Sequence, residues 1–404
     1  MKLDFPDFTR AASWDNISDF YNNQSFLKTT QSLSHTKYTI FPYLMHLGLG
    51  VKYAEWFELK KTSHSVILHR KQAVKEKHWE YNSTFSVAPL TNDMPSHDAI
   101  ALLPSNRSYS TNVWYDRVAI MSTRGYVNIY HNAEWITNFY HIATNIEKFP
   151  LFSAFTIVNP TLIEGDPRSK WVLSYINETL SMFPPEIRPF YVPYSSFFEQ
   201  HDHIWFRRAI FLFINTPVLD MFLSDIEPLL VKKIAYRYYG ISELIAKPDK
   251  LKLLYIARQG EWRQILNERD MIRNITSKCK DVVEFEKAYF ERNTHRMQVL
   301  SMRSTDILLG YHGAAFVNIM FMMPYSGFIE FFSPLLKPRY YDMMAQKTQL
   351  AYRSLTGNNI DLSKKPPRDG RNINMFIDVN MVVEYVNELV EIVNKEKYKI
   401  VSVI

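Results

Sequence analysis

The fold of this chain is decided by one stretch, ILLGYHGAAFVNIMFMMP, at residues 307–324. Its pattern predicts a buried strand, a glycine turn that carries His312, and then a short apolar helix. Such a turn presents backbone N–H groups and the positive end of a helix to an anion, usually a phosphate. A second strand follows at residues 327–332 and contains Glu330. A phosphate at the turn and an acid for a ribose together indicate a nucleotide site.

Strands and helices alternate on both sides of this stretch, which predicts a parallel sheet with helices on both faces. The expected strands are residues 251–257, 282–285, 305–309 and 328–332. The expected helices are residues 263–274, 294–303 and 314–322, with a closing amphipathic helix at 382–395.

The amino-terminal half is less regular and contains mostly short strand-like runs. Strands are expected at residues 66–68, 118–121, 155–158 and 207–213, and a helix at 171–183 that ends before two prolines. Ser224 and Glu227 have the spacing of a capping box, which predicts a helix that ends at Gly240.

At 404 residues the chain is long enough for two domains of ordinary size. Residues 246–250 have the composition of a linker between them. We therefore expect an arm at 1–35, an amino-terminal domain at 36–246, a nucleotide-binding domain at 247–380 and a closing helix at 381–404.

The composition, with 47% hydrophobic and 22% charged residues, is that of a globular protein. Its net charge of +6 favours anionic ligands such as nucleotides. No arginine-rich tract or nucleic-acid motif occurs, so nucleic acid is not an expected partner. Cys279 is the only cysteine, which excludes an internal disulfide and a cysteine-based metal site. No window approaches the roughly 18 apolar residues of a membrane span.

Two features of the sequence point to different cellular compartments. Six Asn-x-Ser/Thr sequences permit a secretory location, at Asn16, Asn23, Asn82, Asn106, Asn177 and Asn274. The opening residues MKLDFP contain an acid and a proline, unlike a signal peptide, and a single cysteine agrees with the cytoplasm. The pattern does not indicate an oligomeric state.

Two arginines stand where a parallel sheet binds anions. Arg258 follows the first expected strand of the second domain, and ligands bind at the carboxyl ends of such strands. Arg263 begins the next expected helix, and Asn267 lies one turn further on. Two guanidiniums and a helix N-terminus suit a diphosphate, which needs several fixed donors. A pair of surface arginines is the alternative.

Several motifs follow one another with a regular spacing: Ile256-x-Arg258, Arg263-x-Ile265-x-Asn267-Glu268, Gln298, Asp306-Ile307-Leu308-Leu309-Gly310-x-His312-Gly313-Ala314, Asn318, Phe321-Met322-x-Pro324 and Ile329-Glu330. In this order they resemble family 61 glycosyltransferases over roughly residues 250–335. That family includes plant β-1,2-xylosyltransferases and animal enzymes that add N-acetylglucosamine to EGF domains or to protein O-mannose.

The resemblance implies an α/β fold of the GT-B type, in which two Rossmann-like domains face each other across a cleft. The carboxy-terminal domain would bind UDP-xylose or UDP-N-acetylglucosamine, and the amino-terminal domain would bring a hydroxyl of a glycan or glycoprotein. Transfer would invert the anomeric centre. The lumen of the ER or Golgi is the location that the family suggests.

The implied donor site consists of Arg258, Arg263, Asn267, His312, Gly313, Ala314 and Glu330. The arginines would bind the diphosphate, the turn would face the phosphates or the sugar, and the acid would bind ribose hydroxyls. The chain contains no Asp-x-Asp, so neither a metal nor another cofactor is expected. His201 and His203, on either side of Asp202, could belong to a metal cluster. No third ligand is indicated for these histidines, so a solvated loop is expected there.

The segment Asn138-Phe139-Tyr140-His141 is similar to an Asn-Tyr-Tyr-His block of the family. His141 is therefore the candidate general base, with Glu134 and Asp116 as alternatives, whereas a buried helix histidine is the structural interpretation. In the family an aspartate usually stands four residues later, where this chain has Asn145. An amide cannot act as a base at neutral pH.

Three functions follow from these patterns. The first is an inverting, metal-independent glycosyltransferase that uses a UDP-sugar. The second is a catalytically inactive relative that binds a glycan or a nucleotide sugar, and Asn145 motivates it. The third, a dehydrogenase, lacks the Gly-x-Gly-x-x-Gly turn after its first strand.

Overall fold

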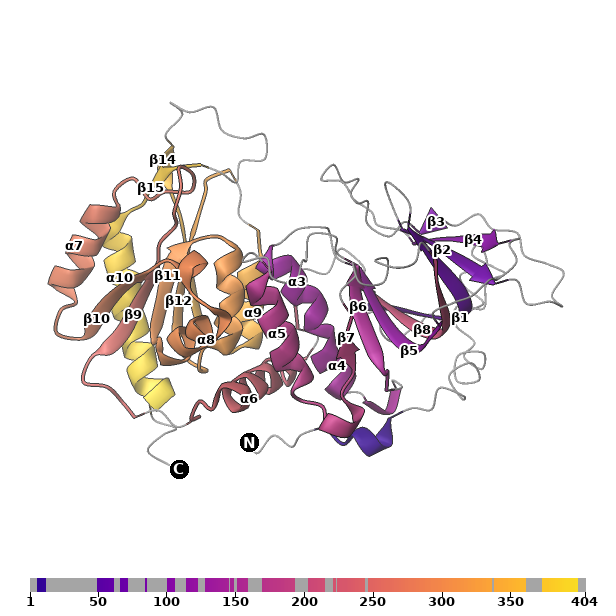
Figure 1. The fold of residues 1–404 in the computed structure, drawn as a ribbon. Helices are drawn as coiled ribbons and strands as arrows, with labels where there is room; N and C mark the ends of the chain where they lie inside the picture. Colours follow the sequence, from indigo (N-terminus) through magenta and orange to yellow (C-terminus); the bar gives the residue numbers. More distant parts are fainter. Residues whose placement is uncertain are drawn as a thin grey trace, which may run out of the picture. The chain divides into compact units, whose positions relative to one another are not determined.

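The computed structural model has two compact units, Met1–Val218 and Leu219–Ile404 (Figure 1). The structure describes residues 6–11, 49–61, 66–71, 84–85, 100–105, 114–122, 128–144, 146–148, 151–158, 169–192, 203–214, 221–222, 224–243, 246–335, 338–360 and 373–398. The expected arm lies almost wholly outside these residues, as do Asn145, His201 and Asp202.

The first unit contains an eight-stranded mixed sheet with the order β3-β4-β2-β1-β8-β5-β6-β7. Its strands are β1 (Leu49–Lys61), β2 (Val66–Lys71), β3 (Thr84–Phe85), β4 (Ile100–Ser105), β5 (Trp114–Ser122), β6 (Ala154–Val158), β7 (Phe190–Tyr191) and β8 (His203–Ile214). The four strands β8, β5, β6 and β7 are parallel to one another, whereas β8 is antiparallel to β1. The strands expected at 66–68, 118–121, 155–158 and 207–213 are confirmed.

Helices connect the parallel strands of this unit. They are α3 (Ile129–Ile136), α4 (Asn138–Thr144) and α5 (Lys170–Leu180), with short 3-10 turns η1 (Phe8–Arg10), η4 (Ile146–Lys148) and η5 (Pro185–Ile187). Polar contacts join α5 to α4 and to the end of α3: Thr179 Oγ1 lies 3.3 Å from the Tyr140 hydroxyl, and Oγ1 of Thr137, the C-cap residue of α3, lies 3.2 Å from the Tyr175 hydroxyl. The helix expected at 171–183 is confirmed, and it ends three residues earlier, at Leu180.

The second unit is built on a five-stranded parallel sheet with the order β10-β9-β11-β12-β13. The strands are β9 (Leu251–Ile256), β10 (Val283–Ala288), β11 (Ile307–Tyr311), β12 (Gly327–Phe332) and β13 (Ala351–Thr356), and β14 (Asn358–Ile360) pairs separately with β15 (Met375–Phe376). Numbered along the chain, the order is 2-1-3-4-5, which is that of a doubly wound sheet. The prediction of a parallel sheet is confirmed.

Helices cover both faces of this sheet (Figure 1). They are α6 (Glu227–Tyr239), α7 (Glu268–Lys278), α8 (His295–Ser304), α9 (Tyr340–Lys347) and α10 (Val379–Ile392), with the 3-10 helices η7 (Phe290–Arg292) and η8 (Ala314–Phe321) and a π-helical turn η9 (Val393–Lys397).

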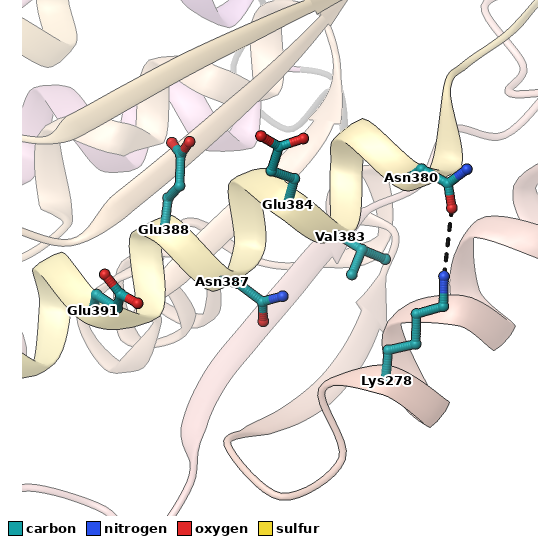
Figure 2. Close-up of a pocket in the computed structure, with 7 residues that line it drawn as sticks. All are labelled: Lys278, Asn380, Val383, Glu384, Asn387, Glu388 and Glu391. Carbon is teal, nitrogen blue, oxygen red and sulfur yellow. Dashed lines mark hydrogen bonds between the residues drawn. The ribbon is translucent and has the colours of Figure 1, made fainter.

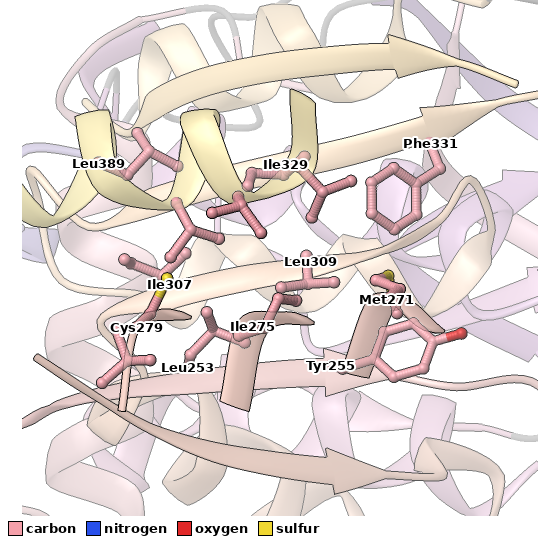
Figure 3. Close-up of a cluster of buried hydrophobic side chains, with 14 of the residues drawn as sticks. Leu253, Tyr255, Met271, Ile275, Cys279, Ile307, Leu309, Ile329, Phe331 and Leu389 are labelled. Atoms are coloured by element: carbon pink, nitrogen blue, oxygen red, sulfur yellow. The ribbon is translucent and has the colours of Figure 1, made fainter. Parts of the chain in front are cut away.

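The two faces of the sheet are filled by alternate residues of the strands. Leu253, Leu309 and Ile329 point to one face, where they pack with Met271 of α7 and Leu389 of α10 (Figure 3). On the other face, the ring of Phe328 packs edge-on against Phe316 of η8, with 4.9 Å between ring centroids. Because both faces are buried, the strands of this unit are nearly continuous apolar runs.

Two local predictions were wrong. The helix expected from 263 begins only at Glu268, because residues 258–264 form a loop in which Arg263 has a φ of 59°. The capping box at Ser224 is not formed, since the residue before α6 is Ile226 and it makes no side-chain cap bond. The helix expected at 314–322 is present as the 3-10 helix η8, whereas α9 and β13 were not predicted.

Helix α6 belongs to the second compact unit, although we assigned it to the amino-terminal domain. The hydroxyl of Tyr236 on α6 donates to the carbonyl oxygen of Phe321 at 2.6 Å, which ties the helix to the end of η8. The helix ends at Gly240, as expected, with a left-handed φ of 66°. The division into an acceptor domain and a donor domain stays a prediction.

The amino edge of the parallel sheet is held by a buried ion pair. Lys397 Nζ lies 2.7 Å from Asp306 Oδ1, and both side chains are almost completely buried. Asp306 also accepts from the backbone N–H of Lys252 at 2.7 Å and from the hydroxyl of Tyr398. Burial lowers the pKa of Lys397, and Asp306 opposes this effect. This cluster therefore joins β9 and β11 to the end of the closing helix.

Candidate functional site

The candidate site lies where the strand order of the second sheet reverses. Strand β9 lies between β10 and β11, so the carboxyl ends of β9 and β11 form a topological switch point, the place where ligands bind in open α/β sheets. Ile256 ends β9 and is paired with Gly310 of β11. Arg258 follows the first of these strands and His312 follows the second, so the fold brings these predicted residues together.

Gly310 allows the two strands to approach closely at this edge. A Cβ atom on residue 310 would lie 2.8 Å from the carbonyl oxygen of Ile256 and 3.1 Å from the ring of Phe316. Both neighbours are buried, so any larger residue would have to displace backbone or core.

Both predicted arginines reach the turn after β11. Nη1 of Arg258 and Nη1 of Arg263 each lie 3.4 Å from the carbonyl oxygen of His312. Gly313 leaves the room for this, because a Cβ atom there would lie 2.0 Å from Nη1 of Arg258. Burial lowers the pKa of Arg258, but a guanidinium stays charged in proteins. Two positive charges therefore converge beside the start of η8, which begins at Ala314 and whose N-cap, Gly313, makes no side-chain cap bond.

The loop that carries the arginines is fixed by amide side chains. Nε2 of Gln264 donates to the carbonyl oxygen of Gly260 at 3.1 Å. Oδ1 of Asn374 accepts from the backbone N–H of Gln264 at 2.9 Å, and its Nδ2 donates to the carbonyl oxygen of Glu261, also at 2.9 Å. The positive φ of Arg263 is therefore held by bonds on both sides of it.

Asn267, expected to bind the donor, has a structural role in this geometry. Its Nδ2 donates to the carbonyl oxygen of Ile377 at 2.8 Å, and its Oδ1 accepts from the N–H of the same residue at 3.1 Å. The amide thus joins the start of α7 to the segment after β15. Gln298 and Asn318 are also structural: Asn318 Nδ2 donates to Gln298 Oε1 at 2.8 Å, which holds η8 on α8.

Glu330 is not available to a ribose in this structure. The residue is fully buried, and both carboxylate oxygens already have partners. Oε1 lies 2.5 Å from Nδ1 of His312, and Oε2 accepts from the hydroxyl of Tyr352 at 2.8 Å. Burial raises the pKa of Glu330, and the hydrogen bonds from His312 and Tyr352 oppose this rise. An acid inside an otherwise apolar strand already signals that it must have a partner.

The three candidate bases all belong to the first unit. His141 lies on α4 and is 3% exposed, within a helix whose residues 138–143 are all buried. Glu134 lies on α3, and its Oε2 is 3.0 Å from Nδ1 of His131. Asp116 lies on β5, where the register with β8 shifts and the next residue, Arg117, has a φ of 58°. The side chain of Asp116 lies outside the described residues.

A separate hollow of about 480 Å³ lies between α7 and α10 and is lined by Lys278, Asn380, Val383, Glu384, Asn387, Glu388 and Glu391 (Figure 2). Lys278 Nζ donates to Asn380 Oδ1 at 3.4 Å, and Glu388 is paired with Arg353 at 2.8 Å. Lys278 and Glu388 therefore have partners on this surface, and none of the lining residues belongs to the site described above.

Neither a metal cluster nor a membrane-spanning helix occurs in the described part of the chain. Within the residues that the structure describes, no three His, Cys, Asp or Glu side chains gather so as to hold a metal ion. No helix among them is both long and apolar enough to cross a membrane.

Replacement of glycine by alanine should have different effects at Gly310 and at Gly313. Gly310→Ala forces a Cβ atom against backbone, so we expect it to lower the free energy of unfolding by about 2 kcal/mol. Gly313→Ala meets only the end of the Arg258 side chain, so stability should change little while anion binding weakens about tenfold. Thermal unfolding and UDP titration of both variants check this. Equal stability losses in the two variants would contradict it.

The parallel sheet and the cations at its switch point define a class: an α/β protein with a site suited to an anionic ligand. Comparison with known proteins identifies the family within this class. The family model of glycosyltransferase 61 matches residues 40–329, so the chain belongs to glycosyltransferase family 61.

A stretch of 155 residues is 26% identical to the EGF domain-specific O-linked N-acetylglucosamine transferase of Drosophila melanogaster. The match covers 36% of this chain and 28% of that protein, so it spans less than a third of the relative. The resemblance found in the motifs is thereby confirmed, and glycosyl transfer is the activity of the family.

Proposed function

We propose that this protein is an inverting glycosyltransferase that moves xylose or N-acetylglucosamine from a UDP-sugar to a hydroxyl of a glycan or glycoprotein. The architecture would be GT-B, with the donor in residues 247–380 and the acceptor in residues 36–246. No metal ion would take part. This function favours the lumen of the ER or Golgi, and the cytoplasm is the alternative.

The convergence of two arginines on one turn is the observation that carries this proposal. Each guanidinium is permanently charged and carries N–H donors, and Nη1 of each lies 3.4 Å from the same carbonyl oxygen, that of His312. A diphosphate offers oxygens to several donors at once and gains negative charge as it leaves the sugar. Arg258, Arg263 and the first turn of η8 can stabilise that charge, which is the task of the metal ion in other glycosyltransferases.

The transfer step needs one further group. The acceptor hydroxyl attacks C1 of the sugar from the face opposite the diphosphate, while a base removes its proton. The C1–O bond breaks, and its electron pair leaves with UDP. Among His141, Glu134 and Asp116, we assign the base to His141, because the block around it is similar to the family's own.

The test is a calorimetric titration with UDP, UDP-xylose and UDP-N-acetylglucosamine, followed by an assay of UDP release from each sugar. We expect UDP and one of the two UDP-sugars to bind, and His141→Ala to slow UDP release about 100-fold without changing UDP affinity. Failure of all three nucleotides to bind would refute the proposal.

A relative that binds a nucleotide sugar or a glycan without turnover is the second candidate. The burial of His141 favours it, because a base must reach its substrate. Asn145, where the family usually has an aspartate, favours it as well. UDP binding with no UDP release in the presence of glycan or glycoprotein acceptors would select this candidate.

A further inference from the structure

Three side chains form a continuous hydrogen-bonded row behind the arginine turn. Tyr352 of β13 donates to Oε2 of Glu330 at 2.8 Å, and Oε1 of the same carboxylate lies 2.5 Å from Nδ1 of His312. Glu330 stands at the centre of β12, where it is fully buried. Each oxygen of the carboxylate therefore has one partner, and the row ends at His312, in the turn after β11.

The ring of His312 is held in place by packing as well. It stacks on Phe332 with 5.4 Å between ring centroids and a tilt of 26°, and the ring of Tyr341 lies 5.3 Å away. Its side chain remains 16% exposed. Nδ1 faces a fully buried carboxylate, which leaves Nε2 as the ring nitrogen that is not bonded to Glu330.

The hydrogen bonds also decide where the ring proton sits. An ionised carboxylate can only accept, so Nδ1 must carry a proton to bond to Oε1. Nε2 is then the ring nitrogen left for a ligand. It accepts from a sugar hydroxyl when the ring is neutral and donates to a phosphate oxygen when the ring is charged.

We propose that Glu330 and Tyr352 are positioning residues that fix the ring and the Nδ1 proton of His312, so that Nε2 is the atom offered to a nucleotide sugar. This inference rests on the proposed function for the identity of the ligand. Its statement about the ring proton of His312 does not depend on any ligand.

The charged and titratable groups around this row come from four parts of the unit: Arg258 and Arg263 of the loop after β9, Tyr340, Tyr341 and Asp342 of α9, Glu330 of β12 and Tyr352 of β13. Among these groups, Asp342 raises the pKa of Glu330, whereas His312 and Tyr352 lower it.

The positioning effect depends on pH through Glu330. Protonation of Glu330 removes the requirement that Nδ1 of His312 carry the ring proton, because a carboxylic acid hydroxyl can itself donate to Nδ1. The positioning effect is therefore present above the pKa of Glu330 and is lost as the pH falls through it. Tyr352→Phe removes a bond that lowers this pKa, so the acidic limb of UDP binding should move to higher pH.

The first measurement is the tautomer of His312 from ¹⁵N histidine NMR spectra of the whole protein without ligand, with the signal assigned by its loss in His312→Gln. We expect an Nδ1–H tautomer in the unchanged protein and in Glu330→Gln, whose amide oxygen can still accept from Nδ1. Glu330→Leu should lose this preference. An unchanged tautomer in Glu330→Leu, or an Nε2–H tautomer in the unchanged protein, would overturn the inference.

The second measurement is UDP affinity from pH 5 to 8 in Tyr352→Phe, with Tyr340→Phe as the matched control. The control removes the same atom from another ring beside His312 and leaves both partners of Glu330 in place. We expect Tyr352→Phe to weaken UDP binding about threefold to tenfold and to shift the acidic limb, and the control to do neither. Equal behaviour of the two variants overturns the inference. If the unchanged protein does not bind UDP, the proposed function fails, and the tautomer measurement still decides the positioning role.

Discussion

Arg258→Ala should weaken UDP binding about 100-fold, while the protein remains folded. Arg258 lies at the carboxyl end of β9 and reaches the turn after β11, where it supplies charged donors that no backbone group can replace. Loss of a charged hydrogen bond costs about 1.5–3 kcal/mol, and a 100-fold loss of affinity corresponds to about 2.8 kcal/mol. Calorimetric titration with UDP measures the effect directly.

Two further variants make this result specific. Arg258→Lys should recover only part of the affinity, because an ammonium cannot form two parallel bonds to a phosphate. Arg273→Ala removes the same charge from the exposed face of α7, where Arg273 is paired with Asp270, and should leave UDP affinity unchanged. A UDP affinity that is equal in Arg258→Ala and in the unchanged protein would exclude Arg258 from the donor site.

Lys397→Met should lower the stability of the second unit by about 3 kcal/mol or more. The substitution keeps the volume of the side chain but leaves the carboxylate of Asp306 buried without its cation. The bonds to Asp306 from the backbone N–H of Lys252 and the hydroxyl of Tyr398 remain. Both of these donors are neutral, so neither replaces the lost positive charge. Hydrogen exchange in the peptide that covers α10 and η9 measures the change.

The matched control is Lys395→Met, which removes the same charge from the same π-helical turn at a position 78% exposed. We expect it to change hydrogen exchange little. A second variant that replaces both Lys397 with Met and Asp306 with Asn should recover part of the lost stability, because no buried charge remains. Equal protection of α10 in Lys397→Met and in the control would show that the ion pair does not hold this edge.

The strands of the second unit could be predicted because each is a short apolar run between polar turns. Residues 251–256, 307–311 and 327–332 are buried on both faces, so their composition alone distinguishes them. Strand β13, with the sequence AYRSLT, lies at the sheet edge and is half-buried, and this is why its pattern was not predictive. Tyr352, which the row behind His312 requires, was missed with it.

The helix start at Glu268 could not be predicted for a different reason. The segment 258–264 has no residue that forbids a helix, but distant groups hold it in a loop. Asn374 binds its backbone, and Arg263 takes a left-handed conformation that a helix would exclude. Asn374 lies more than 100 positions further along the chain, so it reaches this loop only once the chain is folded.

The sequence by itself determined the parallel α/β sheet, the family, and the turn at His312 with two arginines near it. These are local properties, because apolar runs, glycine turns and motif spacing are written in consecutive residues. The tertiary structure alone decided what the polar groups do. It assigned the amide of Asn267 to Ile377, both oxygens of Glu330 to His312 and Tyr352, and Asp306 to Lys397. Polar groups must be satisfied by whatever neighbour the fold supplies, and that neighbour can come from any part of the chain.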